Sequence, residues 1–388
     1  MSDQVFVLLK HWLLGYTPAS LQVAVSILLS IVPILLVFPV LFALTTVLER
    51  KGLGRIQNRY GPNRVGIFGV LQPMADALKS LTKEDIVPAS ADRTVHFLAP
   101  LVLLAVAFVP YAVLPIGRNM IAANLDAGVL FFFAIGAVAE LSVFMAGWSS
   151  RNKYSLLGAM RAVAQMISYE VPLLLSSVAV IMAAGSLSTV EIVQKQSGFS
   201  GIFPHWYVLT PWGFVGFMLF MIAATAETNR SPFDLPEGES EIIAGYYLEY
   251  SGFKFALFFL AEYLGMFAIS GLGITLFLGG WCAPLPFLTW VPSWIWFFVK
   301  LLALIVGFIW VRGTLPRLRM DQLMNFAWKF MLPMALVVLV AAGAWRFLPE
   351  GVTRWLISLI FLAVAYVLLA RGAASRNKIA KRTYRFAE

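Results

Sequence analysis

Acidic residues are concentrated in one short stretch of an otherwise apolar chain. The 388-residue sequence is 60% hydrophobic, yet six of its 20 acidic residues fall within residues 226–250, directly after an uncharged apolar run at about 208–226. The six are Glu227, Asp234, Glu237, Glu239, Glu241 and Glu249. Burying a carboxylate beside lipid is costly unless it is neutralised or paired. Several at one membrane boundary predict a site that handles cations or protons, and a solvated surface loop is the alternative.

Charged residues also lie within or at the edge of segments that are apolar enough to span a membrane. The acids are Glu140, Glu170, Glu227 and Glu262, and Lys300 is the one lysine. Ionisable groups inside a membrane are functional candidates, because exposure to lipid would be costly. The alternative is a buried structural ion pair, such as Lys300 with one of the glutamates. Pro172, two positions after Glu170, can open its helix locally to water or a partner group.

These intramembrane acids are typical of a proton relay. Neighbouring carboxylates raise one another's pKa and titrate as a coupled set, so they can gain and lose protons near neutral pH when a nearby charge appears. We therefore expect the acids of the third to sixth predicted helices to form a line that runs from the acid-rich loop toward the membrane interior.

Hydropathy determines the fold class. Mean hydropathy is +0.82 and only 13% of residues are charged, values outside the range of soluble globular proteins. A helical span needs about 20 apolar residues, whereas barrel strands alternate over about ten. The sequence therefore predicts an all-α polytopic membrane protein with about nine transmembrane helices, the fifth being short. The predicted spans lie near residues 21–48, 96–116, 128–148, 161–184, 208–226, 255–280, 293–312, 328–346 and 353–371.

Two loops have recognisable local structure. In the first, residues 49–95, apolar residues recur at spacings of four and three, which predicts an amphipathic helix in the membrane interface. A helix packed on a partner protein is the alternative. Its stripe consists of Ile67, Leu71, Met74, Leu78 and Leu81. In the acid-rich loop, Asp234 and Glu237 flank a proline in a helix-start pattern, so these two acids have a possible structural role.

Basic residues predict the orientation of the chain in the membrane. With the N-terminus outside, 23 of the 29 Lys and Arg residues lie in the inner loops and tail, five lie outside, and Lys300 lies in a span. This bias follows the positive-inside rule and accounts for most of the net charge of +9 without nucleic acid as a partner. The chain is thus expected in the cell (inner) membrane, with its large loops and C-terminus in the cytoplasm.

Cysteine and histidine usage argues against a redox or metal centre in this chain. Cys282 is the only cysteine, which excludes disulfides within the chain and thiolate zinc or iron–sulfur sites built by this chain alone. The three histidines are far apart in sequence, so paired axial haem ligands are not expected.

Five long motifs resemble a known family. They are ERKGLGRIQNRYGPNRVG at 49–66, LQPMADALKSLTKE at 71–84, NKYSLLGAMRAVAQMISYE at 152–170, AETNRSPFDLPEGESE at 226–241 and TLPRLRMDQLM at 314–324. These closely resemble the H-subunit family of the proton-translocating NADH:quinone oxidoreductases, respiratory complex I. The similarity covers the first eight predicted helices, residues 1–352. A ninth helix and a basic tail, residues 353–388, exceed the eight-helix core of the family.

The resemblance implies a membrane subunit of an enzyme whose electrons are carried by its partners. Soluble iron–sulfur subunits complete the chamber where quinone, the substrate, is bound and reduced. The acidic channel of this chain leads toward antiporter-like membrane subunits, and membrane lipid surrounds the chain. By position, the residues of the quinone chamber and its loops are Glu49, Arg50, Arg59, Asp76, Arg230, Asp234, Glu237, Glu239 and Glu241. The implied proton-relay residues are Glu227, Glu170, Glu262, Glu249 and Glu140, the last of these on a weaker motif match.

Two other functions are compatible with parts of the sequence. The homologous subunit of a membrane-bound hydrogenase complex is the nearer one, although the full first-loop and acidic-loop motifs favour the quinone enzyme. A stand-alone cation or proton transporter would use the acids as its ion path. The basic, turn-rich loop at 49–66 argues against that, because it is typical of a surface that binds other proteins.

Overall fold

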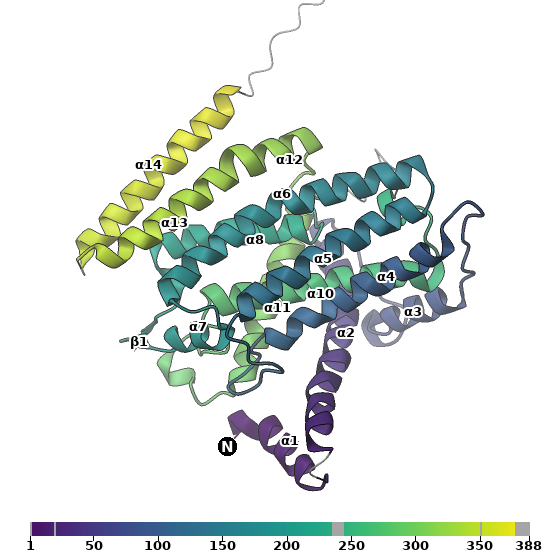
Figure 1. The fold of residues 1–388 in the computed structure, drawn as a ribbon, viewed down its shortest axis with the longest axis horizontal. Helices are drawn as coiled ribbons and strands as arrows, with labels where there is room; N and C mark the ends of the chain where they lie inside the picture. Colours follow the sequence, from purple (N-terminus) through teal and green to yellow (C-terminus); the bar gives the residue numbers. More distant parts are fainter. Residues whose placement is uncertain (1, 19–20, 235–243, 350, 377–388) are drawn as a thin grey trace, which may run out of the picture.

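The computed structural model describes residues 2–18, 21–234, 244–349 and 351–376, and these residues are almost entirely helical (Figure 1). The α-helices are α1 (Val5–Gly15), α2 (Gln22–Ile56), α3 (Gln72–Thr82), α4 (Arg93–Phe108), α5 (Gly128–Ser149), α6 (Lys153–Ala184), α7 (Thr189–Lys195), α8 (Pro211–Glu227), α10 (Gly252–Phe277), α11 (Ser293–Thr314), α12 (Met320–Phe326), α13 (Leu332–Phe347) and α14 (Val352–Arg376).

Short elements connect these helices. The 3-10 turns are Ser2–Gln4, Ile67–Gly69, Val109–Val113, Tyr207–Leu209, Gly245–Tyr247 and Pro286–Leu288, and a π-helical turn, Ala327–Met331, joins α12 to α13. Strands β1 (Phe199–Ser200) and β2 (Phe203–Pro204) form a small antiparallel hairpin in which Phe199 pairs with Pro204.

The predicted fold class is confirmed. Among the described residues, eight helical segments are long and apolar enough to cross a membrane, and each coincides with a predicted span. The remaining predicted span, the fifth, corresponds to α8, which is apolar but only 17 residues long. Helix α6 begins at Lys153, ahead of its apolar window, because the Asn152 side chain caps it by accepting the Tyr154 N–H at 3.0 Å.

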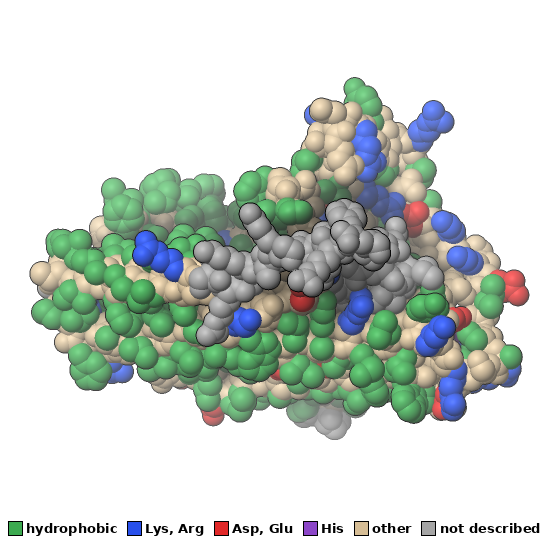
Figure 2. Space-filling view, turned by 90° about the horizontal axis from the view of Figure 1, so that it is seen from above, with side chains coloured by type: hydrophobic (Ala, Val, Ile, Leu, Met, Phe, Trp, Pro, Cys, Tyr) green, Lys and Arg blue, Asp and Glu red, His purple; other side chains and the backbone are tan. Residues whose placement is uncertain are grey.

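Most of the long helices form one bundle, and α2 and α14 lie at its edges. Helices α4, α5, α6 and α8 run side by side in Figure 1, whereas α2 leaves the bundle steeply toward α1, and α14 lies on the outer side of α13. Helix α10 lies in the middle, with nearly every side chain from Tyr263 to Phe277 buried. In Figure 2, Lys and Arg side chains gather mainly toward one end of the molecule, and hydrophobic side chains cover most of the rest.

Lys300 pairs with none of the glutamates that the structure describes, so the predicted alternative of an ion pair with an intramembrane glutamate is wrong. The Lys300 ammonium donates to three carbonyl groups just beyond α10, at 2.7, 2.8 and 2.7 Å, and lies 4.1 Å from the ring centroid of Trp206. The three carbonyls belong to Leu278, Gly280 and Cys282. Carbonyls at the end of a helix lack intrahelical donors and attract cations, so this lysine is a C-terminal cap for the central helix.

The amphipathic segment of the first loop is shorter than predicted. Ile67 lies in a separate turn, because Gly66 and Gly69 adopt positive φ angles of 70° and 75° and interrupt the helix. Helix α3 therefore begins only after Leu71. It packs against α10 and α2, and its predicted apolar stripe, from Leu71 through Leu81, is half-exposed or more. An exposed apolar stripe on a docked helix fits either lipid or a partner protein.

One close backbone approach provides a test of the fold. A Cβ atom on Gly158 of α6 would lie 2.6 Å from the Cα atom of Gly245, so the turn before α10 depends on the missing side chain. Gly158→Ala should destabilise the protein by about 1–3 kcal/mol through overpacking. Gly307→Ala is the matched control, since nothing lies within 4 Å of its added methyl group. Thermal melting of the purified protein measures both variants, and equal melting temperatures for Gly158→Ala and Gly307→Ala would contradict this packing.

Candidate functional site

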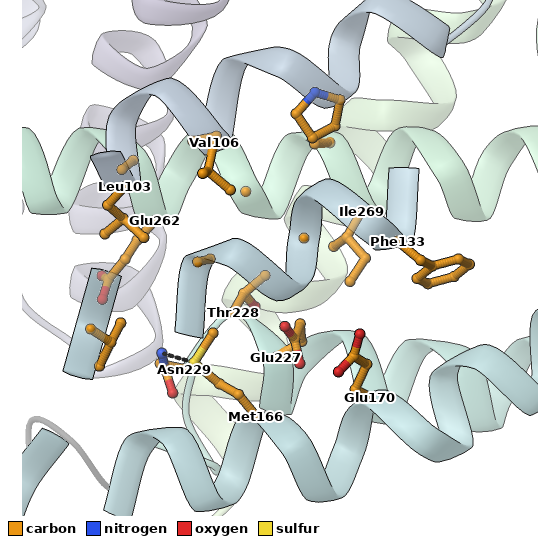
Figure 3. A pocket seen from close by; sticks show the side chains of 18 of the residues that line it. Leu103, Val106, Phe133, Met166, Glu170, Glu227, Thr228, Asn229, Glu262 and Ile269 are labelled. Carbon is orange, nitrogen blue, oxygen red and sulfur yellow. Dashed lines mark hydrogen bonds between the residues drawn. The ribbon is translucent and has the colours of Figure 1, made fainter. Parts of the chain in front are cut away.

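A cavity of about 120 Å³ lies between α4, α5, α6, α10 and the end of α8. Its walls are mostly apolar, with Phe133 and Ile269 among them, but three glutamates also line it: Glu170 from α6, Glu227 from α8 and Glu262 from α10. Figure 3 shows Glu227 and Glu170 turned toward each other, with Glu262 farther along the cavity. A cavity of this size has room for several water molecules beside the three carboxylates, since one water needs about 10–15 Å³.

Another acid, Glu140 of α5, lies close to Glu170 and Glu227. The carboxyl groups of Glu140 and Glu170 are within hydrogen-bonding reach of each other, and both act electrostatically on Glu227. One carboxyl oxygen each of Glu140 and Glu227 is buried and has no hydrogen-bond partner among the described residues. Charging one of these carboxyl groups makes it harder to charge its neighbours, so the three are suited to bind protons as one coupled set. The structure thus brings together three acids that are far apart in sequence.

A second charged cluster lies where α2, α10, α11 and the acid-rich loop meet. Arg312 donates to the Glu49 carboxylate, and the Tyr263 hydroxyl donates to its other oxygen at 2.5 Å. Arg230 approaches the same carboxylate at 3.6 Å, and its guanidinium lies 3.8 Å from the centroid of the Tyr263 ring. Burial alone would lower the pKa of Arg230, but Tyr263 and Glu49 outweigh it and raise that pKa above its usual value. Arg230 therefore remains charged at every physiological pH.

Glu262 connects the charged cluster with the cavity. The Tyr247 hydroxyl donates to the Glu262 carboxylate, and the Tyr246 hydroxyl lies 3.2 Å from that carboxylate and 2.7 Å from the Tyr247 hydroxyl. Arg230 also acts on Glu262 electrostatically. Hydroxyl groups both donate and accept hydrogen bonds, so this row of groups is suited to passing a proton.

A buried amide holds the start of the acid-rich loop. The Gln165 side chain in α6 donates at 2.7 Å to the carbonyls of both Ala226 and Phe233, and it lies 3.3 Å from the Asn229 side-chain oxygen. Asn229 itself has a positive φ of 50°, and this sharp turn directs Arg230 back toward Glu49. Asparagine tolerates this conformation better than most residues.

Asp234 fixes the other end of this loop segment. Arg317 donates to its carboxylate at 2.9 Å, and the Leu318 N–H donates to the Pro232 carbonyl at 3.2 Å. Burial raises the pKa of Asp234, and the positive charge of Arg317 opposes that rise. Glu237, Glu239 and Glu241 lie outside the described residues, and so does the helix start predicted after Asp234.

The remaining predicted residues lie farther from the cluster. Arg50 follows Glu49 but points to the surface, where it pairs with Asp76 at 2.6 Å, both side chains being well exposed. Arg59 donates to Gln57 within its own loop. Glu249 accepts from Asn152 at 2.6 Å, at the end of the bundle where the basic loops lie. Among the described residues, no three His, Cys, Asp or Glu side chains converge to hold a metal ion.

Several residues of the site are not predicted from the sequence. Most are uncharged, and an uncharged polar residue in an apolar helix gives a weak signal. Arg312 is charged, but in the sequence it is recognisable only as a basic residue at the end of a predicted helix. A search for polar side chains within apolar windows would have found Gln165, whereas nothing local distinguishes the tyrosines from packing aromatics. The residues missed are Gln165, Asn229, Tyr246, Tyr247, Tyr263 and Arg312.

Comparison with known proteins identifies the family. A family described as NADH dehydrogenase matches residues 29–343, which include every residue of both clusters. The chain belongs to the NADH dehydrogenase family. A protein of Polaromonas naphthalenivorans (strain CJ2) is 43% identical over 363 residues, covering 91% of this chain and all of that protein. One from Dehalococcoides mccartyi (strain CBDB1) is 50% identical over 293 residues, covering 76% and 79%. Both are named as the H subunit of an NADH-quinone oxidoreductase.

The Geobacillus kaustophilus (strain HTA426) protein of the same name is 47% identical over 303 residues, 77% of this chain and 88% of its own length. The family match ends before α14, which begins at Val352. The match does not by itself assign a role to any one residue.

The Glu49 cluster provides a stability test. Glu49→Gln would remove the carboxylate that buried Arg230 shares with partly exposed Arg312. Breaking a buried ion pair typically costs about 3–5 kcal/mol. The matched control is Asp76→Asn, which breaks the exposed pair with Arg50 and should cost no more than about 1 kcal/mol. Denaturation of the purified complex in detergent compares the two. Equal losses of stability would show that Glu49 is not the counter-charge of this cluster.

Proposed function

We propose that this chain is the subunit of an NADH:quinone oxidoreductase that forms part of the quinone chamber and couples quinone reduction to proton translocation. The observation that carries the proposal is the group of Glu140, Glu170 and Glu227 at a cavity inside the membrane bundle, connected through Glu262 to the Glu49–Arg230 cluster. The names of the relatives support the quinone enzyme over a hydrogenase subunit.

In this proposal the electrons remain on partner subunits. Soluble iron–sulfur subunits reduce the quinone headgroup, and this chain supplies apolar helix surfaces for the quinone tail together with ionisable walls. The cavity of about 120 Å³ is too small for a whole quinone and suits water instead, which supports a chamber at the loop end, beside the Glu49–Arg230 cluster. The N-terminus lies outside, and the basic loops face the cytoplasm and the soluble subunits.

Electrostatics provides the coupling. Reduction of quinone places negative charge beside Arg230 and Arg312, which competes with Glu49 and Glu262 for these cations. A unit charge about 4 Å away changes the energy of a neighbouring charge by about 4 kcal/mol at an effective dielectric constant of about 20. This corresponds to about three pKa units. Glu262 then takes up a proton, and the three-carboxylate set redistributes its own protons toward the antiporter-like subunits.

Two substitutions test this function. Glu227→Gln and Glu170→Gln keep the size of each side chain but remove its ability to titrate. We expect assembled complexes whose NADH:quinone turnover and proton pumping fall together, by about tenfold or more. Measurements in membrane vesicles compare them with Glu191→Gln, an exposed glutamate of α7 that lies outside both clusters.

Normal turnover and pumping in both variants would remove these glutamates from the coupling path. A complex that fails to assemble would instead indicate a structural role for the carboxylates. Loss of pumping with normal turnover would separate proton transfer from quinone reduction and would contradict the tight coupling proposed here.

A further inference from the structure

One fully buried histidine, His96, lies outside both clusters of the site. It lies in the first turn of α4, and its ring stacks on that of Tyr250, with centroids 4.0 Å apart and planes inclined by 5°. Neither ring nitrogen makes a hydrogen bond with a described residue, although the backbone of Glu249 lies nearby. Buried polar atoms in folded proteins are almost always paired, so these two nitrogens need an explanation.

Charged groups surround this imidazole on the side of the basic loops. Those that act on it are Lys254 from α10, Asp85 from the loop after α3, and Glu249 from the segment before α10. Lys254 and Asp85 form an ion pair at 2.7 Å, and the Asp85 side chain is 48% exposed. The Tyr250 hydroxyl lies 3.3 Å from that of Ser149 at the end of α5. His96 is therefore close to an ion pair that is open to water.

On its inner side, His96 adjoins the row of groups that leads to the cavity. Tyr250, on which it stacks, packs edge-on against Phe258, and the rings of Tyr246 and Tyr247 pack against the same Phe258. These two tyrosines contact the Glu262 carboxylate. Glu249 acts electrostatically on His96 and lies in the same segment as the two tyrosines, two positions after Tyr247, while Glu262 lines the cavity.

We propose that His96 is a further proton-transfer residue, which supplies the cavity from the side of the basic loops. This rests on the function proposed above. A proton from water binds a ring nitrogen, forming an N–H bond, and passes to the Glu249 carboxylate, which leaves a neutral imidazole ready for the next proton. An imidazole ring can take up a proton on one nitrogen and release one, which suits it to a transfer step. The stack on Tyr250 holds the ring without using its nitrogens.

His96→Phe tests the proposal, because phenylalanine keeps the stack on Tyr250 but cannot carry a proton. We expect NADH:quinone turnover in membranes to fall about fivefold near pH 8 and less near pH 6, since protons in water become scarcer as pH rises. The Michaelis constant for quinone should not change. His205→Phe is the matched control, since the His205 ring hydrogen-bonds to Ser200 at the β1–β2 hairpin and belongs to neither cluster. Wild-type turnover and pH profile in His96→Phe would overturn the proposal.

If His96→Phe does not assemble, His96→Ala provides the second test. Added imidazole should restore its turnover, whereas pyrazole, which has the same shape but stays unprotonated at neutral pH, should not. Equal rescue by both, or by neither, would overturn proton transfer and leave a packing role. If Glu227→Gln and Glu170→Gln lose turnover but His96→Phe does not, only this inference fails. If all three are normal, the proposed function fails as well.

Discussion

The buried contact of Arg230 with Glu49 and Tyr263 is the interaction on which the rest of the site depends. It joins the acid-rich loop to α2 and α10, and Arg312 brings in α11 through the same carboxylate. Removing charges from water costs several kcal/mol each, and only good geometry and further hydrogen bonds offset that cost. Gln165 provides part of the geometry, because it holds the loop on both sides of Arg230. A change in charge at this point therefore acts on four elements at once.

The two clusters differ in the sign of their charge, and this difference gives the site a direction. Near the loops, two arginines compensate one glutamate, so a negative charge is stabilised there. Inside the bundle, the charged groups that act on Glu227 are Glu140 and Glu170, which are themselves acids. Glu262 and its tyrosines lie between the two clusters. In the proposed mechanism a negative charge arrives at the loop end, and protons move in response toward the cavity.

Much of the fold could be predicted from the sequence, because a membrane requires apolar helices of a certain length. This requirement alone predicts the spans. It does not predict that Gly66 and Gly69 separate Ile67 from helix α3, because the spacing of apolar residues carries no information about backbone angles. The acids of the cavity could be named, since a charge in an apolar window is conspicuous. Their contacts could not. Glu49 and Arg50 are neighbours in sequence but face a buried cluster and the surface respectively, and Lys300 binds carbonyls rather than a carboxylate.

The central claim is that carboxylates at the cavity change protonation when quinone is reduced. Infrared difference spectroscopy of the assembled complex in membranes measures this directly, because a protonated carboxyl group has a C=O stretching band that a carboxylate lacks. The account predicts a carboxyl band that changes on quinone reduction in the wild type and is lost or shifted in Glu227→Gln. A difference spectrum without a carboxyl band, or with one that Glu227→Gln leaves unaltered, would contradict it.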